Sequence, residues 1–131
     1  MPLIKSYDTF SDVKEHIKRG HILSAGATIT VPSNKIITVT DSFHFLLAGT
    51  NQVERINATV TAPAGQVLVL MRASGGATVT VMSGIGSGNI DLQGADAPLN
   101  APNDTLTLMY DGTKWVGLAS RLSATGDVTD A

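Results

Sequence analysis

Between His21 and Leu122 the chain consists of short runs of β-branched and aromatic residues that are separated by turn-forming residues. Within most runs apolar and polar residues alternate, which is the period of a strand with one buried face. Glycine, proline and asparagine, which favour tight turns, lie between the runs. The pattern predicts an all-β domain built as a sandwich, a barrel or a short β-helix, because the regular spacing of the runs fits all three. The expected strands are residues 27–31, 35–40, 43–47, 56–61, 66–71, 77–82, 89–93, 105–110 and 115–119.

One short α-helix is expected ahead of this β region, and it ends at Gly20. Thr9 can cap its first turn. Its apolar face consists of Phe10, Val13 and Ile17, which are enough to dock on a surface but too few to build a core. The chain is therefore expected to divide into an N-terminal arm and helix at 1–20, a β-rich domain at 21–122 and a C-terminal tail at 123–131.

The segment DTLTLMYDGTKWVG, residues 104–117, predicts a β-hairpin. Asp111 and Gly112 can supply the two positive φ angles of a type I′ turn. Such a two-residue loop would place Trp115 opposite Leu108 as a cross-strand aromatic anchor, whereas a G1-bulged loop would shift the pairing by one residue. The residues expected to anchor the hairpin are Tyr110, Asp111, Gly112 and Trp115, the only tryptophan in the chain.

Charge and cysteine content bear on partners and compartment. With a net charge of −2 and 15% charged residues, the chain has no basic face for nucleic acid and no polybasic segment for anionic lipid. The chain has no cysteine, which excludes disulfides and thiolate metal sites. Because its first residues lack a long apolar stretch, we expect neither a secretory signal nor a membrane span. The expected partners therefore include neither nucleic acid nor a membrane.

Neither the glycine-rich loop nor the histidines form a recognisable site. Residues 83–89 carry three glycines after an expected strand, but another strand follows where a phosphate-binding loop requires a helix. His16 and His21 share no helix face that could hold a metal. His44 alternates with two phenylalanines, so we expect it on the polar, solvated face of its strand. We therefore expect no metal-binding and no cofactor-binding residues, and no cofactor.

Four aspartates raise the alternative of glycoside hydrolysis, because two carboxylates suffice for that chemistry. Asp104 and Asp111 are better explained as turn formers, and Asp96 lies in a loop before Pro98. Binding a sugar chain would normally need more exposed aromatic residues than the six of this chain. We therefore expect no catalytic residues and a protein that is not an enzyme.

Three strands favour association between copies of the chain. The run at 67–71 is apolar throughout, so it is expected to be covered on both faces, either in the core or beneath a neighbouring subunit. The strands at 27–31 and 77–81 carry threonine along one face and lack the lysines that normally guard sheet edges. Such uncharged faces predict a homo-oligomer.

The order of segments between Leu23 and Arg121 resembles a recurrent module of tailed-bacteriophage virion proteins. The resemblance rests on LSAGATITVPSNKIITVT, FHFLLAGTNQVERI, GQVLVLMRASGGATVTV, GNIDLQG and the closing hairpin DTLTLMYDGTKWVGLASR. Such modules occur in tail fibres and spikes and in small head-decoration proteins, typically as trimers. The resemblance implies a structural role in the virion and a homotrimer.

The short chain favours a free-standing capsid decoration, or cement, protein that binds the phage head as a trimer and stabilises it. Its partners would then be itself and the major capsid protein, and it would be made and assembled in the host cytoplasm. The alternatives are a small tail-fibre or baseplate component and a carbohydrate-active enzyme of phage spike type. For the decoration protein, the candidate capsid-docking residues are Leu3, Ile4, Tyr7 and Phe10, all in the N-terminal segment.

Overall fold

The computed structural model describes residues 23–59, 61–84, 86 and 88–123, and the expected helix, the N-terminal arm and most of the C-terminal tail lie outside them. Every regular element of this described part is a β-strand, in agreement with the all-β prediction. The strands are β1 (Ile29–Thr30), β2 (Ile36–Val39), β3 (Phe43–Leu47), β4 (Gln52–Val53), β5 (Arg55–Ala58), β6 (Val67–Arg72), β7 (Val79–Val81), β8 (Ile90–Asp91), β9 (Ala97–Leu99), β10 (Thr105–Tyr110) and β11 (Trp115–Arg121).

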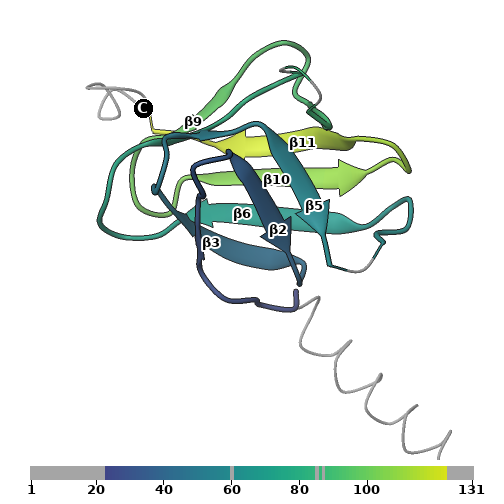
Figure 1. Ribbon diagram of the computed structural model, residues 1–131, viewed down its shortest axis with the longest axis horizontal. Helices are drawn as coiled ribbons and strands as arrows, with labels where there is room; N and C mark the ends of the chain where they lie inside the picture. Colours follow the sequence, from purple (N-terminus) through teal and green to yellow (C-terminus); the bar gives the residue numbers. More distant parts are fainter. Residues whose placement is uncertain (1–22, 60, 85, 87, 124–131) are drawn as a thin grey trace, which may run out of the picture.

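The largest sheet has the strand order β1-β3-β6-β10-β11-β8. In Figure 1 β3, β6, β10 and β11 follow one another from bottom to top. β6, β10 and β11 are antiparallel neighbours, whereas β1, β3 and β6 run parallel and β8 runs parallel to β11. At the centre of this sheet Thr107 lies opposite Val69 on one side and Ala119 on the other. Only the β10–β11 pair is a local hairpin, so most of the sheet joins segments that are distant in sequence.

Two smaller sheets form a second layer. β2 pairs with β5 in parallel, and the other small sheet has the order β4-β7-β9. In Figure 1 β2 and β5 run across the strands of the large sheet. Buried side chains from the large sheet and from both small sheets form one hydrophobic core. Its members are Val31, Ile37, Val39, Leu46, Val53, Ile56, Leu68, Leu70, Val79, Val81, Ile90, Ala97, Leu99, Leu106, Leu108 and Trp115.

The hairpin between β10 and β11 forms, but with a different register from the predicted one. Tyr110 pairs with Trp115, and Leu108 pairs with Gly117. Of the two expected turn residues only Gly112 has a positive φ, of 104°. The Asp111 carboxylate accepts hydrogen bonds from the backbone N–H groups of Thr113 and Lys114, both at 2.7 Å. These bonds close a longer loop over residues 111–114, so neither the type I′ turn nor its one-residue shift is correct.

β4 and β9 were not expected as strands. β9 contains Pro98, which has no N–H to donate, but it lies at the edge of its sheet, where only one side needs pairing. The prediction that 67–71 is covered on both faces is not met within one chain. Leu68 and Leu70 are buried in the core, whereas Val67 and Val69 on the other face are only half-buried.

His44 contradicts the expectation of a solvated side chain, because it is 1% exposed. The inner face of β3 carries His44 and Leu46, and the phenylalanines lie on the outer face. The imidazole Nε2 accepts hydrogen bonds from the backbone N–H groups of Thr40 and Asp41 at 3.0 and 3.1 Å, and Nδ1 lies 2.7 Å from the Ala27 carbonyl oxygen. A carbonyl only accepts, so Nδ1 carries a proton toward Ala27 while Nε2 accepts, and the ring is a core residue.

Candidate functional site

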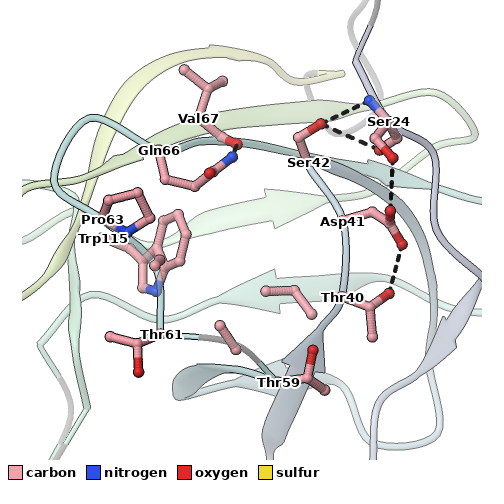
Figure 2. A pocket seen from close by; sticks show the side chains of 13 residues that line it. Ser24, Thr40, Asp41, Ser42, Thr59, Thr61, Pro63, Gln66, Val67 and Trp115 are labelled. Carbon is pink, nitrogen blue, oxygen red and sulfur yellow. Dashed lines mark hydrogen bonds between the residues drawn. The ribbon is translucent and has the colours of Figure 1, made fainter. Parts of the chain in front are cut away.

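A hollow of about 340 Å³ opens beside the hairpin tryptophan (Figure 2). Its wall is formed mainly by residues from the β2–β3 turn, from the segment after β5 and from the start of β6. Trp115 is 3% exposed, so its ring supports the wall and offers no open face on which a sugar could stack. The lining residues are Ser24, Val39, Thr40, Asp41, Ser42, Ala58, Thr59, Thr61, Ala62, Pro63, Gln66, Val67 and Trp115.

Asp41 is the one acidic residue of this hollow. Its two carboxylate oxygens accept hydrogen bonds from the hydroxyls of Ser24 and Thr40, both at 2.7 Å (Figure 2). The bond from Ser24, followed by that from Thr40, lowers the pKa of the Asp41 carboxyl. Asp41 is therefore an ionised acceptor that ties the segment before β1, at Ser24, to the β2–β3 turn. It lacks the raised pKa that a general acid requires.

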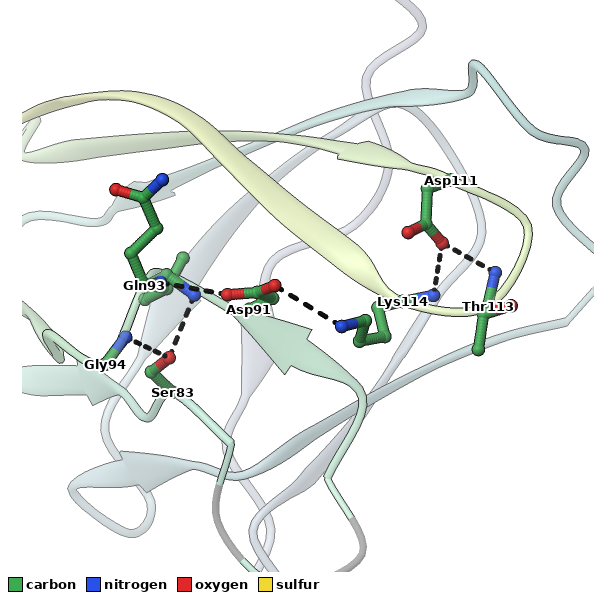
Figure 3. A network of polar contacts seen from close by, with 8 residues as sticks. Ser83, Asp91, Gln93, Gly94, Asp111, Thr113 and Lys114 are labelled. Carbon is green, nitrogen blue, oxygen red and sulfur yellow. Dashed lines mark hydrogen bonds and ion pairs between the residues drawn. The ribbon is translucent and has the colours of Figure 1, made fainter.

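A polar network links β8 to the hairpin loop (Figure 3). Asp91 accepts a hydrogen bond from the Gln93 backbone N–H at 2.9 Å and lies 3.4 Å from the Lys114 ammonium. These two contacts, with the Gln93 bond the larger, lower the pKa of Asp91. The backbone N–H groups of Lys114 and Thr113 likewise lower the pKa of Asp111. Both carboxylates stabilise turns, and neither is tuned as the protonated partner of a glycosidase pair.

Asp104 is the buried carboxylate of the described chain, with 1% of its surface exposed. It accepts hydrogen bonds from the backbone N–H groups of Asn100, Ala101 and Ser123 at 2.9, 3.1 and 3.1 Å, and from the Ser123 hydroxyl at 2.7 Å. Burial raises the pKa of Asp104, but these bonds outweigh it, and the net effect is a lowered pKa. The predicted turn former thus also fixes Ser123, which follows β11.

Arg72 is buried at the end of β6, with 5% of its surface exposed. Its guanidinium donates to the carbonyl oxygens of Ala77 and Asn100 at 3.1 and 3.0 Å, and to those of Gly75 and Gly76 at 3.1 and 3.4 Å. It therefore holds the β6–β7 loop against the turn before β10. The sequence signal for this role is the alternation of β6, in which every second residue from Leu68 to Arg72 faces the core.

The exposed side of the large sheet is the remaining candidate surface, here called the outer face. Its side chains alternate with the buried ones, and none of them belongs to the core or packs against it. Its members on β3, β6 and β10 carry no charge. The outer face consists of Phe43, Phe45 and Leu47 on β3, Val67, Val69 and Met71 on β6, Thr105, Thr107 and Met109 on β10, and Val116, Ala119 and Arg121 on β11.

Within the described residues no three His, Asp or Glu side chains lie close enough together to hold a metal ion. The described part also has no helix of the length and hydrophobicity that a membrane crossing requires. The candidate docking residues Leu3, Ile4, Tyr7 and Phe10 lie outside the described chain.

Residues 21–116 match the family model of the phage depolymerase C-terminal β-sandwich domain. The chain belongs to this family. No curated protein matches the chain. Family membership agrees with the two packed layers and selects the sandwich from the three architectures that the sequence pattern allowed. It also supports the phage origin and the structural character that the resemblance implied.

Within the sandwich, the four hairpin residues lie close together, with Tyr110 paired to Trp115. The rings of Tyr110 and Trp115 lie 5.0 Å apart between centroids, tilted by 45°. Asp111 and Gly112 form the loop above them. The sequence missed the buried polar residues His44 and Arg72, because each follows the burial period of its strand while being polar.

Proposed function

We propose that this protein is a structural component of a bacteriophage tail spike or tail fibre. The observation that carries the proposal is the match of residues 21–116 to the C-terminal sandwich domain of phage depolymerases. Membership of a phage depolymerase domain family supports a tail-spike or tail-fibre location over the head-decoration role expected from chain length. If the chain is found on the phage head, bound to the major capsid protein, the head-decoration role replaces this proposal.

The proposed role is mechanical and not enzymatic. Three of the four aspartates considered for glycoside hydrolysis stabilise turns, and their pKa values are lowered by the bonds that they accept. The fourth, Asp96, accepts a hydrogen bond from the backbone N–H of Ser83 at 2.9 Å. These contacts support a function of the carboxylates in holding loops.

The chain would act as a homotrimer within the virion, as the resemblance to phage modules implies. The N-terminal segment 1–20 would connect the sandwich to the rest of the particle, with Leu3, Ile4, Tyr7 and Phe10 as its contact residues. Light scattering coupled to size exclusion tests the assembly. A particle near three times the 13.6 kDa chain mass is expected, and a dimer mass would contradict the trimer.

The tail location is tested on purified virions. Heads and tails are separated, and the copy number of the chain in each fraction is measured by quantitative mass spectrometry, with immunogold labelling of intact particles as a second readout. We expect tens of copies at most, all in the tail fraction. Hundreds of copies on heads would establish the decoration protein instead. Oligosaccharide release that is abolished by Asp91→Asn would establish the enzyme.

A further inference from the structure

We infer that the outer face of the large sheet is the surface through which copies of this chain pack on one another. This inference deepens the proposed function, on which it rests, by naming the partner and the contact surface. The first observation is that two strands of this sheet carry apolar residues on the face that points away from the core. β3 and β6 run parallel and carry apolar residues on both faces, and parallel strands of this kind are normally covered on both faces.

The apolar residues of the outer face form continuous rows across neighbouring strands. Phe43 lies beside Val69, and Phe45 lies beside Met71. The rings of Phe43 and Phe45 meet edge to face, with 5.1 Å between centroids. A further row joins Val67 to Met109 and Val116. The face is therefore one connected apolar surface.

Charged groups lie only at the margins of this surface among the described residues. Arg121 lies at the far end of β11, and Asp91 lies on β8 beside Val116, where it is paired with Lys114. The outer faces of neighbouring copies in the proposed trimer can therefore meet without burying an unpaired charge. An anionic lipid surface is a poor occupant, because the chain carries a net charge of −2 and this face offers no cluster of cations.

The size of the face also favours a second copy over the chain's own N-terminal segment. Four strands about 4.8 Å apart, with about five residues at 3.4 Å each, give a footprint of roughly 300 Å². A single helix, as the sequence of segment 9–20 predicts, is about 10 Å wide and would cover about half of that width. The sheets of neighbouring copies offer a wider surface, and packed sheets lie about 10 Å apart.

The footprint is smaller than the ~800 Å² per partner of a standard interface. It matches the largest apolar patch of a typical monomer, which is often functional. The outer face is therefore expected to be the apolar centre of a larger contact between copies. The polar surroundings of this centre would supply the remaining area.

The test introduces a charge at the centre of the face and the same charge on the opposite layer. Thr107, between Val69 and Ala119, is replaced by lysine in the full chain. The matched control is Thr38→Lys, at an exposed position of β2 on the second layer. Thr107→Val removes the hydroxyl without adding charge. Mass is measured by light scattering across a concentration series, with circular dichroism and thermal melting to verify folding.

Thr107→Lys is expected to weaken association by more than about 100-fold, since an unpaired charge would be buried. Thr38→Lys and Thr107→Val are expected to keep the wild-type mass. Two results overturn the inference: a wild-type monomer, or an oligomer that persists in folded Thr107→Lys. Cover by the chain's own N-terminal segment would give a monomeric wild type whose melting temperature falls in Thr107→Lys. Each result is independent of the virion fractionation, so the contact surface and the tail location can fail separately.

Discussion

Replacing Asp104 by alanine is expected to lower the free energy of unfolding by about 3 kcal/mol. The carboxylate is 1% exposed and accepts four hydrogen bonds, from the backbones of Asn100, Ala101 and Ser123 and from the Ser123 hydroxyl. A hydrogen bond to a charged group contributes about 1.5–3 kcal/mol net. The expected loss is smaller than the sum over the four hydrogen bonds for two reasons. The alanine variant no longer desolvates a charge, and water can reach some of the released N–H groups.

The magnitude can be followed by thermal or urea unfolding. For a domain of about 100 residues a loss of 1 kcal/mol lowers the melting temperature by roughly 4–8 °C, so a decrease of about 12–24 °C is expected. Asp111→Ala is the matched control. Asp111 also accepts two backbone hydrogen bonds but lies on an exposed loop, so its replacement should have a smaller effect.

The pH dependence separates the charge of Asp104 from its packing. Its pKa is lowered in the folded chain, so its stabilisation is complete above the unfolded-state pKa of about 3.9. The stabilisation is lost as the pH falls through the lower folded-state pKa. The difference between wild type and Asp104→Asn should therefore shrink as the pH falls below about 4. A difference that stays constant as the pH falls would refute the assignment to the carboxylate.

Three further changes test the core and the domain boundary. Trp115→Ala should cost about 3–5 kcal/mol in denaturant unfolding, because the ring is 3% exposed and packs on Tyr110; an unchanged midpoint would mean that the ring is not a core residue. Gly26→Ala should destabilise by about 1–3 kcal/mol, since its Cβ would lie 2.2 Å from the His44 ring, and a melting temperature equal to wild type would contradict this packing. Deletion of residues 1–20 should leave a sandwich that unfolds cooperatively but no longer binds virions, and a non-cooperative melt would show that the segment belongs to the core.

Much of the strand pattern could be predicted from sequence because it depends on local alternation. β3 spans the expected residues, and β6 and β10 differ from the expectation by at most one residue at an end. The apolar run of β6 already indicated a strand with apolar residues on both faces. The Asp-Gly pair correctly marked the reversal between β10 and β11. These features follow from side-chain period and turn preference, which need no distant partner.

Only the tertiary structure decided how the strands combine and where the polar groups are buried. The parallel pairing of β3 with β6 depends on contacts between segments that are distant in sequence, which a local pattern does not encode. The hairpin register depends on two hydrogen bonds to the Asp111 carboxylate, and these override the intrinsic preference for a shorter loop. His44 and Arg72 are buried because the fold supplies backbone N–H and carbonyl partners that satisfy them, and the cost of burying a polar group depends on such partners.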